Sequence, residues 1–218
     1  LTAIFAVLAL VIAAHLAFSP QQMRVADQLP GGVVRFGIGN LIGGLSAMMG
    51  AAEEAGLDGV GLTGHCIVTE VEFGRREQYG LVETYERRRE VIDAARERTD
   101  LRLYDAAEMC FVEDELDATR AFLETADFEY TIGSVHFAAE YDHTSDAPYV
   151  DADDEALRAA IERYYDAVVA LVESELFDVL GHLDLPERLE TLRGYSRPED
   201  YERVAAALAD SGTVPEIN

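Results

Sequence analysis

The chain has 218 residues and a formal net charge of −25, from 42 acidic and 17 basic residues. Every basic residue is arginine, because the sequence contains no lysine. So acidic a surface repels phosphate backbones, which argues against a partner made of nucleic acid. The length suffices for one domain with a sizeable core. Its two cysteines, Cys66 and Cys110, are too few for a disulfide framework, so we expect reduced thiols in the cytoplasm.

The first fifty residues differ in composition from the rest. They hold one acid, Asp27, and two arginines, Arg24 and Arg35, so the remaining residues carry a net charge of −26. Residues 1–18 are almost wholly apolar and as a helix would reach about 27 Å, which is marginal for a bilayer core of about 30 Å. Three interpretations stay open for an N-terminal extension, residues 1–32: a membrane segment, a helix packed on the domain, or sequence translated upstream of the true start.

From Ser46 onward, helical segments alternate with short apolar runs. Apolar residues at helical spacing or helix-end signals predict helices over 46–55, with Gly56 at its end, and over 81–97, 114–125, 153–173 and 198–209. The apolar runs, which read as buried strands, are 60–65, 101–108, 130–136 and 177–182, and another begins at Val214. This alternation predicts an α/β fold, arranged as one barrel domain over residues 33–218.

Each of the four predicted strands ends on a residue that can bind a metal, namely His65, Glu108, His136 and His182. The carboxyl ends of barrel strands meet at one rim, where side chains far apart in sequence converge. A lone histidine at a strand end is more often structural than a ligand, but four candidates at equivalent ends favour a metalloenzyme. Divalent ions held there would polarise a phosphate ester and activate water. By contrast, we predict that His143, in an acidic loop, is merely exposed.

Five stretches of the sequence resemble one known family. They are AAEEAGLDGVGLTGHC (51–66), YDAAEMCF (104–111), IGSVHF (132–137), DVLGHLDLPER (178–188) and VPEIN (214–218). In order and spacing they resemble PHP-domain (polymerase and histidinol phosphatase) proteins, most of all the histidinol-phosphatase-like branch. The resemblance covers the chain from about residue 45 onward. Separately, the lysine-free acidic composition resembles proteins of salt-adapted archaea, which implies a halophilic protein and carries no information about the reaction.

The resemblance implies a fold and a reaction. The fold is a distorted seven-stranded (β/α) TIM-like barrel, here without its C-terminal strand or strands. Such proteins bind up to three ions, usually zinc, manganese or iron, and hydrolyse a small phosphomonoester such as histidinol phosphate. By this resemblance Glu108 bridges two ions, His136 and His182 complete the shared ion as catalytic residues, and His65 serves a further ion. The implied partner is thus a small phosphorylated substrate.

The sequence matches one further motif and departs from three. Asp184 and Arg188 fall on an HxDLxxR-like stretch, which implies that they orient the substrate. The family's first-strand HxH motif is missing, since no histidine lies between His15 and His65. The usual Asp-His pair is here Gly64-His65, and the late DxH motif is missing because no histidine follows His182. One ion site keeps its ligands, so we predict fewer than three ions and weak or absent catalysis.

The alternative function is a non-catalytic or fragmentary PHP barrel that binds one metal or a partner without turnover. A barrel without its closing strands would expose an apolar patch to such a partner. Two other classes fit less well. Many amidohydrolase barrels bridge their ions through a modified lysine, and this chain has none. A polymerase-associated proofreading module needs a basic path for DNA, which the acidic composition does not provide.

Overall fold

The computed structural model describes residues 45, 49–67, 80–81 and 85–216, and the side chains of 65–67, 80–81 and 85–88 fall outside the description. The chain divides into two compact units. The first unit comprises Leu1–Thr63, Glu83–Asp105 and Asn218, and the second comprises Gly64–Val82 and Ala106–Ile217. The predicted extension, residues 1–32, lies outside the described residues, so its boundary stays a prediction. Among the helices that are described, none is long and apolar enough to span a membrane.

A six-stranded sheet has the order β2-β1-β3-β4-β7-β8. Its strands are β1 (Gly59–Ile67), β2 (Gly80–Leu81), β3 (Arg102–Cys110), β4 (Tyr130–Ser134), β7 (Val179–Leu180) and β8 (Val214–Pro215). The pairings β1–β2, β3–β4, β4–β7 and β7–β8 are parallel, which confirms the predicted α/β fold with a parallel sheet. Closure into a seven-stranded barrel stays a prediction, because residues 33–44 are not described.

The helices follow the predicted alternation. They are α4 (Tyr85–Arg96), α5 (Leu116–Ala126), α6 (Asp154–Glu173) and α7 (Pro198–Ala209), with the short turns η3 (Glu113–Glu115), η4 (Ala147–Tyr149) and η5 (Leu185–Arg188). The ranges predicted for α6 and α7 agree with the structure to within one residue. The predicted helix over 81–97 begins too early, because Leu81 belongs to β2. Strand β2 has only two residues, which is too short for a sequence pattern that distinguishes it from the helix that follows.

The first unit shows why its helices end and dock where they do. Gly56 adopts a left-handed conformation with φ 68°, and the Leu57 N–H donates to the Ala52 carbonyl at 3.0 Å, so the helical turn ends at the predicted glycine. Helix α4 contributes Ile92 to a buried cluster that includes strand residues of β1 and β3. The Arg89 guanidinium of α4 also donates to the buried Asp105 carboxylate of β3 at 2.8 Å.

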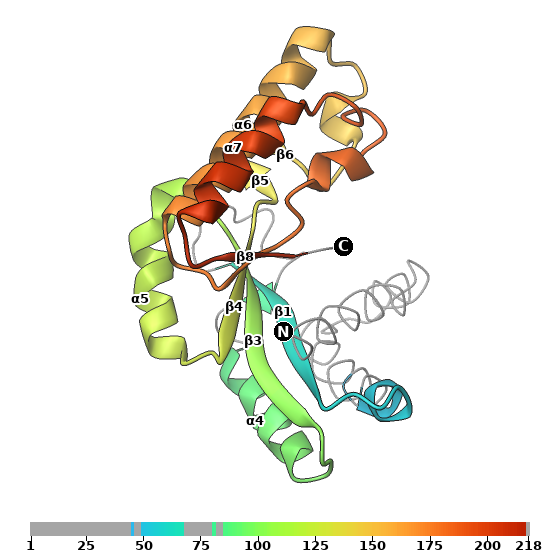
Figure 1. The fold of residues 1–218 in the computed structure, drawn as a ribbon, viewed down its shortest axis with the longest axis vertical. Coiled ribbons are helices and arrows are strands. Elements are labelled where there is room, and N and C mark those ends of the chain that lie inside the picture. The colour runs from blue at the N-terminus through green and yellow to red at the C-terminus, as the bar shows by residue number, and fades with distance from the viewer. Residues whose placement is uncertain (1–44, 46–48, 68–79, 82–84, 217–218) are drawn as a thin grey trace, which may run out of the picture. The chain divides into compact units, whose positions relative to one another are not determined.

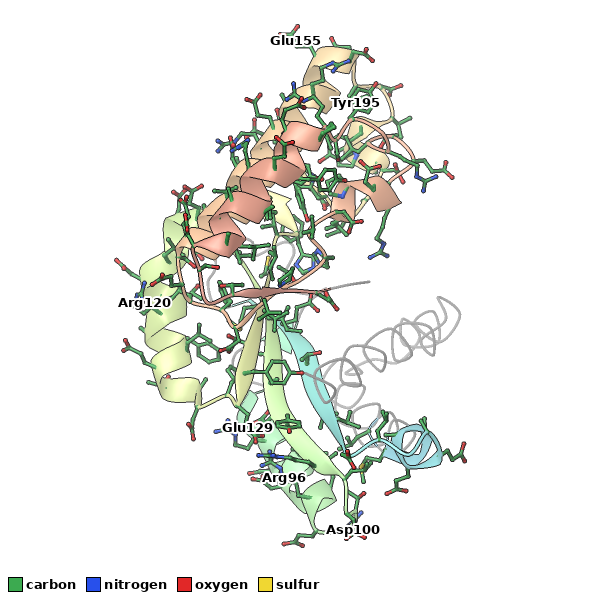
Figure 2. All side chains as sticks on the ribbon, viewed as in Figure 1. Arg96, Asp100, Arg120, Glu129, Glu155 and Tyr195 are labelled. Atoms are coloured by element: carbon green, nitrogen blue, oxygen red, sulfur yellow. The ribbon has the colours of Figure 1, made fainter. Side chains whose placement is uncertain are left out.

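The second unit has the larger core, and α6 supplies much of it. The stripe predicted from helical spacing is buried throughout, namely Leu157, Ile161, Tyr164, Tyr165, Val168 and Leu171. Helix α7 runs alongside α6 (Figure 1). The opposite helix faces are charged: Figure 2 shows Arg120 on α5 and Glu155 on α6 pointing outward, and both are exposed. Apolar burial along α6 therefore fixes which side of this helix faces the strands.

Two glycines allow β4 and β7 to lie close to their neighbours. A Cβ atom added to Gly133 would lie 2.5 Å from Cδ2 of the Phe177 ring. One added to Gly181 would collide with the Ser134 hydroxyl oxygen. The two strands also share a hydrogen bond from the Gly181 N–H to the Gly133 carbonyl at 2.9 Å. Any larger side chain at either position must push β4 and β7 or their packing partners apart.

The prediction that His143 is exposed is wrong. Strands β5 (Phe137–Ala138) and β6 (Tyr141–Asp142) form an antiparallel hairpin, and the His143 N–H donates to the His136 carbonyl at 2.9 Å. The ring is fully buried, with its centroid 4.9 Å from that of Tyr164 and 6.2 Å from that of Tyr149. Neither ring nitrogen has a hydrogen-bond partner among the described residues. Burial therefore lowers the pKa of His143 from 6.5 to about 4.

We predict that Gly133→Ala lowers the free energy of unfolding by about 1–3 kcal/mol, because the new methyl group overlaps the Phe177 ring. Urea unfolding of the chelator-treated protein measures the change. Gly212→Ala is the matched control, since a Cβ atom at Gly212 meets nothing within 4 Å. If both alanine variants were equally stable, β4 would not be packed as closely as described.

We further predict that His143 makes the protein sensitive to acid. The folded pKa of about 4 lies below the unfolded value of 6.5, so the unfolded chain binds more protons between these values. The contribution of neutral His143 is present above pH 6.5 and is lost as the pH falls to 4, by up to about 3 kcal/mol. Urea unfolding at several pH values, without metal, should show a shallower pH dependence for His143→Leu. Identical slopes would contradict the prediction.

Candidate metal centre

Three of the four predicted ligands belong to the second unit and lie on, or two residues beyond, neighbouring strands. Glu108 is on β3. The neighbouring strand β4 ends two residues before His136, and β7, the next strand in the sheet, ends two residues before His182. The predicted strands 130–136 and 177–182 are therefore longer than the observed ones. Because these three strands are parallel and adjacent, residues within two positions of their carboxyl ends come to one edge of the sheet.

The three side chains converge on one point. The His182 Nε2 atom lies 3.4 Å from Glu108 Oε1, and His136 Nε2 lies 3.5 Å from the same oxygen. The two Nε2 atoms are 3.2 Å apart, with the ring planes at 65°. These atoms form a nearly equilateral triangle of one oxygen and two nitrogens. All three can act as ligand atoms for a single ion.

The size of this triangle fits a tetrahedral ion. Ligand atoms at about 2.0–2.1 Å from a tetrahedral zinc lie about 3.3–3.4 Å from one another. The observed separations of 3.2, 3.4 and 3.5 Å lie around that value. Two neutral imidazoles and one carboxylate are also a common set for a catalytic zinc site, which leaves its fourth position to water or substrate. The residues present therefore fit a divalent ion without rearrangement of the side chains.

The surroundings of the triangle favour a bound cation. Glu108 is 8% exposed and His136 is 5% exposed, while the His182 side chain keeps 14% of its surface. A buried carboxylate needs a compensating charge or hydrogen bonds, because transfer of its charge out of water is costly. The two Nε2 atoms face each other at 3.2 Å, and two neutral rings can form only one hydrogen bond between these atoms, with one nitrogen as donor and the other as acceptor. A divalent ion would balance the carboxylate charge and accept both nitrogen lone pairs.

Two unpredicted groups contact the peptide of His182. The Tyr164 hydroxyl donates to the His182 carbonyl at 2.7 Å, and the His182 N–H donates to Glu216 Oε2 at 3.1 Å. Helical spacing assigned Tyr164 to the core, which is correct but does not reveal what its hydroxyl binds. Glu216 lies in the VPEIN stretch, which is one of the five stretches that resemble the family. That resemblance was the only signal in the sequence that could have pointed to Glu216.

The remaining predicted site residues are less fully described. His65 lies within β1, with its side chain outside the description, so its role as a ligand stays a prediction. Asp184 immediately precedes η5 and Arg188 ends it, two and six residues after His182. Both side chains are exposed. Their predicted role in orienting a substrate is compatible with this exposure and is not tested by it.

Comparison with solved structures shows the same fold in two bacterial proteins. One is a histidinol phosphate phosphatase from Lactococcus lactis, solved with zinc, L-histidinol and phosphate. It matches with a TM-score of 0.57 and 18% identity over 77% of this chain and 64% of its own length. The other is a putative histidinol phosphatase from Listeria monocytogenes, with a TM-score of 0.54 and 16% identity over 72% of this chain and 68% of its own.

Comparison of sequences gives the family. A probable histidinol-phosphatase from Deinococcus radiodurans is 34% identical over 62 residues, which are 28% of this chain and 24% of that protein. The chain thus matches about a quarter of that relative and less than two thirds of the Lactococcus protein. The model of the PHP domain matches residues 42–216. This match spans most of the sequence and includes all three residues of the triangle, and so the chain belongs to the PHP domain family.

Proposed function

We propose that this protein is a metal-dependent phosphoesterase that hydrolyses a small phosphomonoester, with histidinol phosphate as the first candidate. The observation that carries the proposal is the triangle of Glu108, His136 and His182, whose dimensions fit one tetrahedral ion. The bacterial protein of the same fold that was solved with zinc, L-histidinol and phosphate supports the choice of substrate class. Zinc is the ion that we propose first, with manganese and iron as alternatives.

Each of the proposed site residues would have a distinct role in metal or substrate binding. When bound, the ion polarises the phosphate ester and lowers the pKa of a water molecule. Glu108 supplies the negative charge that holds the ion, and neutral His136 and His182 fix its position. Glu108 would also bridge to a further ion served by His65. The exposed Arg188 offers a planar guanidinium that can bind two phosphate oxygens at once, and Asp184 would help to orient the substrate.

The finer features of the proposal come from the family resemblance. We infer a seven-stranded barrel over residues 33–218, cytoplasmic and adapted to salt, with fewer than three ions. The missing HxH motif leaves one complete set of ligands among the residues of this chain, so we propose that hydrolysis by this polypeptide is weak or absent. The missing HxH histidines also favour the second candidate function, a PHP barrel that binds one metal or a partner without turnover.

We predict that Glu108→Gln abolishes metal binding. The substitution keeps the size of the side chain but removes the negative charge that two neutral histidines cannot replace. After incubation with zinc and dialysis, elemental mass spectrometry should find the ion in the unmodified protein and not in the variant. Glu155→Gln, on the exposed surface of α6, is the matched control and should keep the ion. Unchanged metal content in Glu108→Gln would contradict the proposed ligand set.

We also predict the metal content and activity of the protein itself. Purified in concentrated salt without chelator, it should hold about one ion and release little or no phosphate from histidinol phosphate, because one ligand set is complete. Both quantities are measured on the same sample. Two or three ions with clear hydrolysis would show that other residues replace the missing histidines. Such a result would support the phosphoesterase and refute the predicted weakness.

A further inference from the structure

The peptide of His182 is held from two sides by side chains that are distant in sequence. From α6, the Tyr164 hydroxyl donates to the His182 carbonyl at 2.7 Å. Beyond β8, the Glu216 carboxylate accepts from the His182 N–H at 3.1 Å. The carbonyl also accepts the Leu185 N–H at 3.2 Å, which is the local turn that leads into η5. Both backbone polar groups of His182, which belong to the two peptide units that flank its Cα atom, are therefore fixed by tertiary contacts.

Among the described residues, no group supports the imidazole of His182 in the way that is usual for metal-binding histidines. Such a ring usually donates its second N–H to a carboxylate or carbonyl, which sets its orientation. The Nδ1 atom of His182 is buried and has no hydrogen-bond partner among the described residues. Among the described residues, orientation of the ring therefore depends on its Nε2 contacts to Glu108 and His136 and on the backbone to which it is attached. The two contacts on the His182 peptide are the groups that hold this backbone.

Tyr164 is well placed to hold a fixed position. Its side chain is fully buried, and its ring packs edge-on against His143 with centroids 4.9 Å apart. The backbone of His143 is in turn bonded to the His136 carbonyl at 2.9 Å. The pair Tyr164 and His143 thus connects the peptides of both histidine ligands. Burial raises the pKa of Tyr164, so its hydroxyl keeps the proton that it donates.

We propose that Tyr164 and Glu216 are positioning residues of the metal centre, which hold the His182 peptide so that Nε2 points at the ion. The inference rests on the proposed function, since it presupposes that Glu108, His136 and His182 bind a metal. It assigns to Tyr164 a role beyond core packing, and to Glu216 a role that requires no direct bond to the ion. Neither residue is a catalytic residue in this scheme.

The test compares two neighbouring tyrosines of α6. Tyr164→Phe removes the hydroxyl that binds the His182 carbonyl. Tyr165→Phe is the matched control, because Tyr165 is equally buried and donates its hydroxyl to Ser196 at 3.1 Å, away from the ligands. The Kd for zinc is measured by titration against a chelator of known affinity. We expect Tyr164→Phe to raise the Kd about tenfold, as is typical for loss of an outer-shell contact, and Tyr165→Phe to leave it unchanged.

A spectroscopic readout separates positioning from a general loss of stability. Cobalt(II) replaces zinc in the same proteins, and its visible absorption reports the geometry of the ligands. At saturating cobalt, Tyr164→Phe should shift the absorption bands, whereas Tyr165→Phe should give the spectrum of the unmodified protein. Equal Kd values and identical spectra for the two variants would overturn the inference. Should Tyr164→Phe fail to fold, Glu216→Ala provides the same comparison from the other side of the peptide, with the same expected shifts.

Failure of the inference differs from failure of the proposed function. If the unmodified protein binds neither zinc nor cobalt, the metal centre itself is wrong and the positioning role is refuted with it. If the unmodified protein binds both ions and Tyr164→Phe and Glu216→Ala behave as it does, the metal centre stands and the positioning role alone is refuted.

Discussion

The close approach of β4 and β7 is the constraint on which the candidate site depends. His136 and His182 are 46 residues apart in sequence, yet their Nε2 atoms lie 3.2 Å apart. His136 follows β4, which contains Gly133, and His182 follows Gly181, which comes directly after β7. A Cβ atom would have no room at either glycine. Parallel pairing aligns the strand ends. Gly181 lets the chain after β7 lie against Ser134 of β4, and Gly133 leaves room for the Phe177 ring. The separation of the ligand atoms is thus a property of the backbone packing.

Helix α6 links this packing to the chemistry of the site. One side of it supplies apolar residues to the core of the second unit, which is the ordinary task of an amphipathic helix. The same side carries Tyr164, whose hydroxyl reaches the carbonyl of a ligand residue. Helix α6 therefore contributes both to the stability of the core and to the geometry of the triangle. Under the proposed function, a substitution in α6 would alter metal affinity although it lies outside the proposed ligand set.

The sequence predicts some features of this fold well and others poorly, for physical reasons. The ranges of α6 and α7 follow from long periodic patterns and from signals at their ends, such as Pro198 at the start of α7. The strand ends are less exact: β4 stops at Ser134 because β-ladder pairing ends there, while the apolar composition continues to His136. The prediction for His143 was wrong because an acidic loop reads as solvated. Burial of its ring depends on a hairpin that composition does not reveal.

For the site, convergence of three candidate ligands was predictable, because parallel strands bring their carboxyl ends together whatever lies between them. The contacts to the His182 peptide were not, since a tyrosine at helical spacing has the same pattern whether or not its hydroxyl binds anything. The family resemblance added the assignment of roles, which no pattern of spacing provides. The match of the PHP domain over residues 42–216 supports that resemblance for most of the chain.

The unpartnered Nδ1 of His182 has a consequence for the tautomer of its ring. Coordination through Nε2 would require the ring proton to lie on Nδ1, where the described residues offer no acceptor. Without an ion, the proton can instead lie on Nε2, which is 3.4 Å from the Glu108 carboxylate oxygen. Entry of an ion at the proposed centre would therefore change the tautomer of His182, and release of the ion would reverse that change.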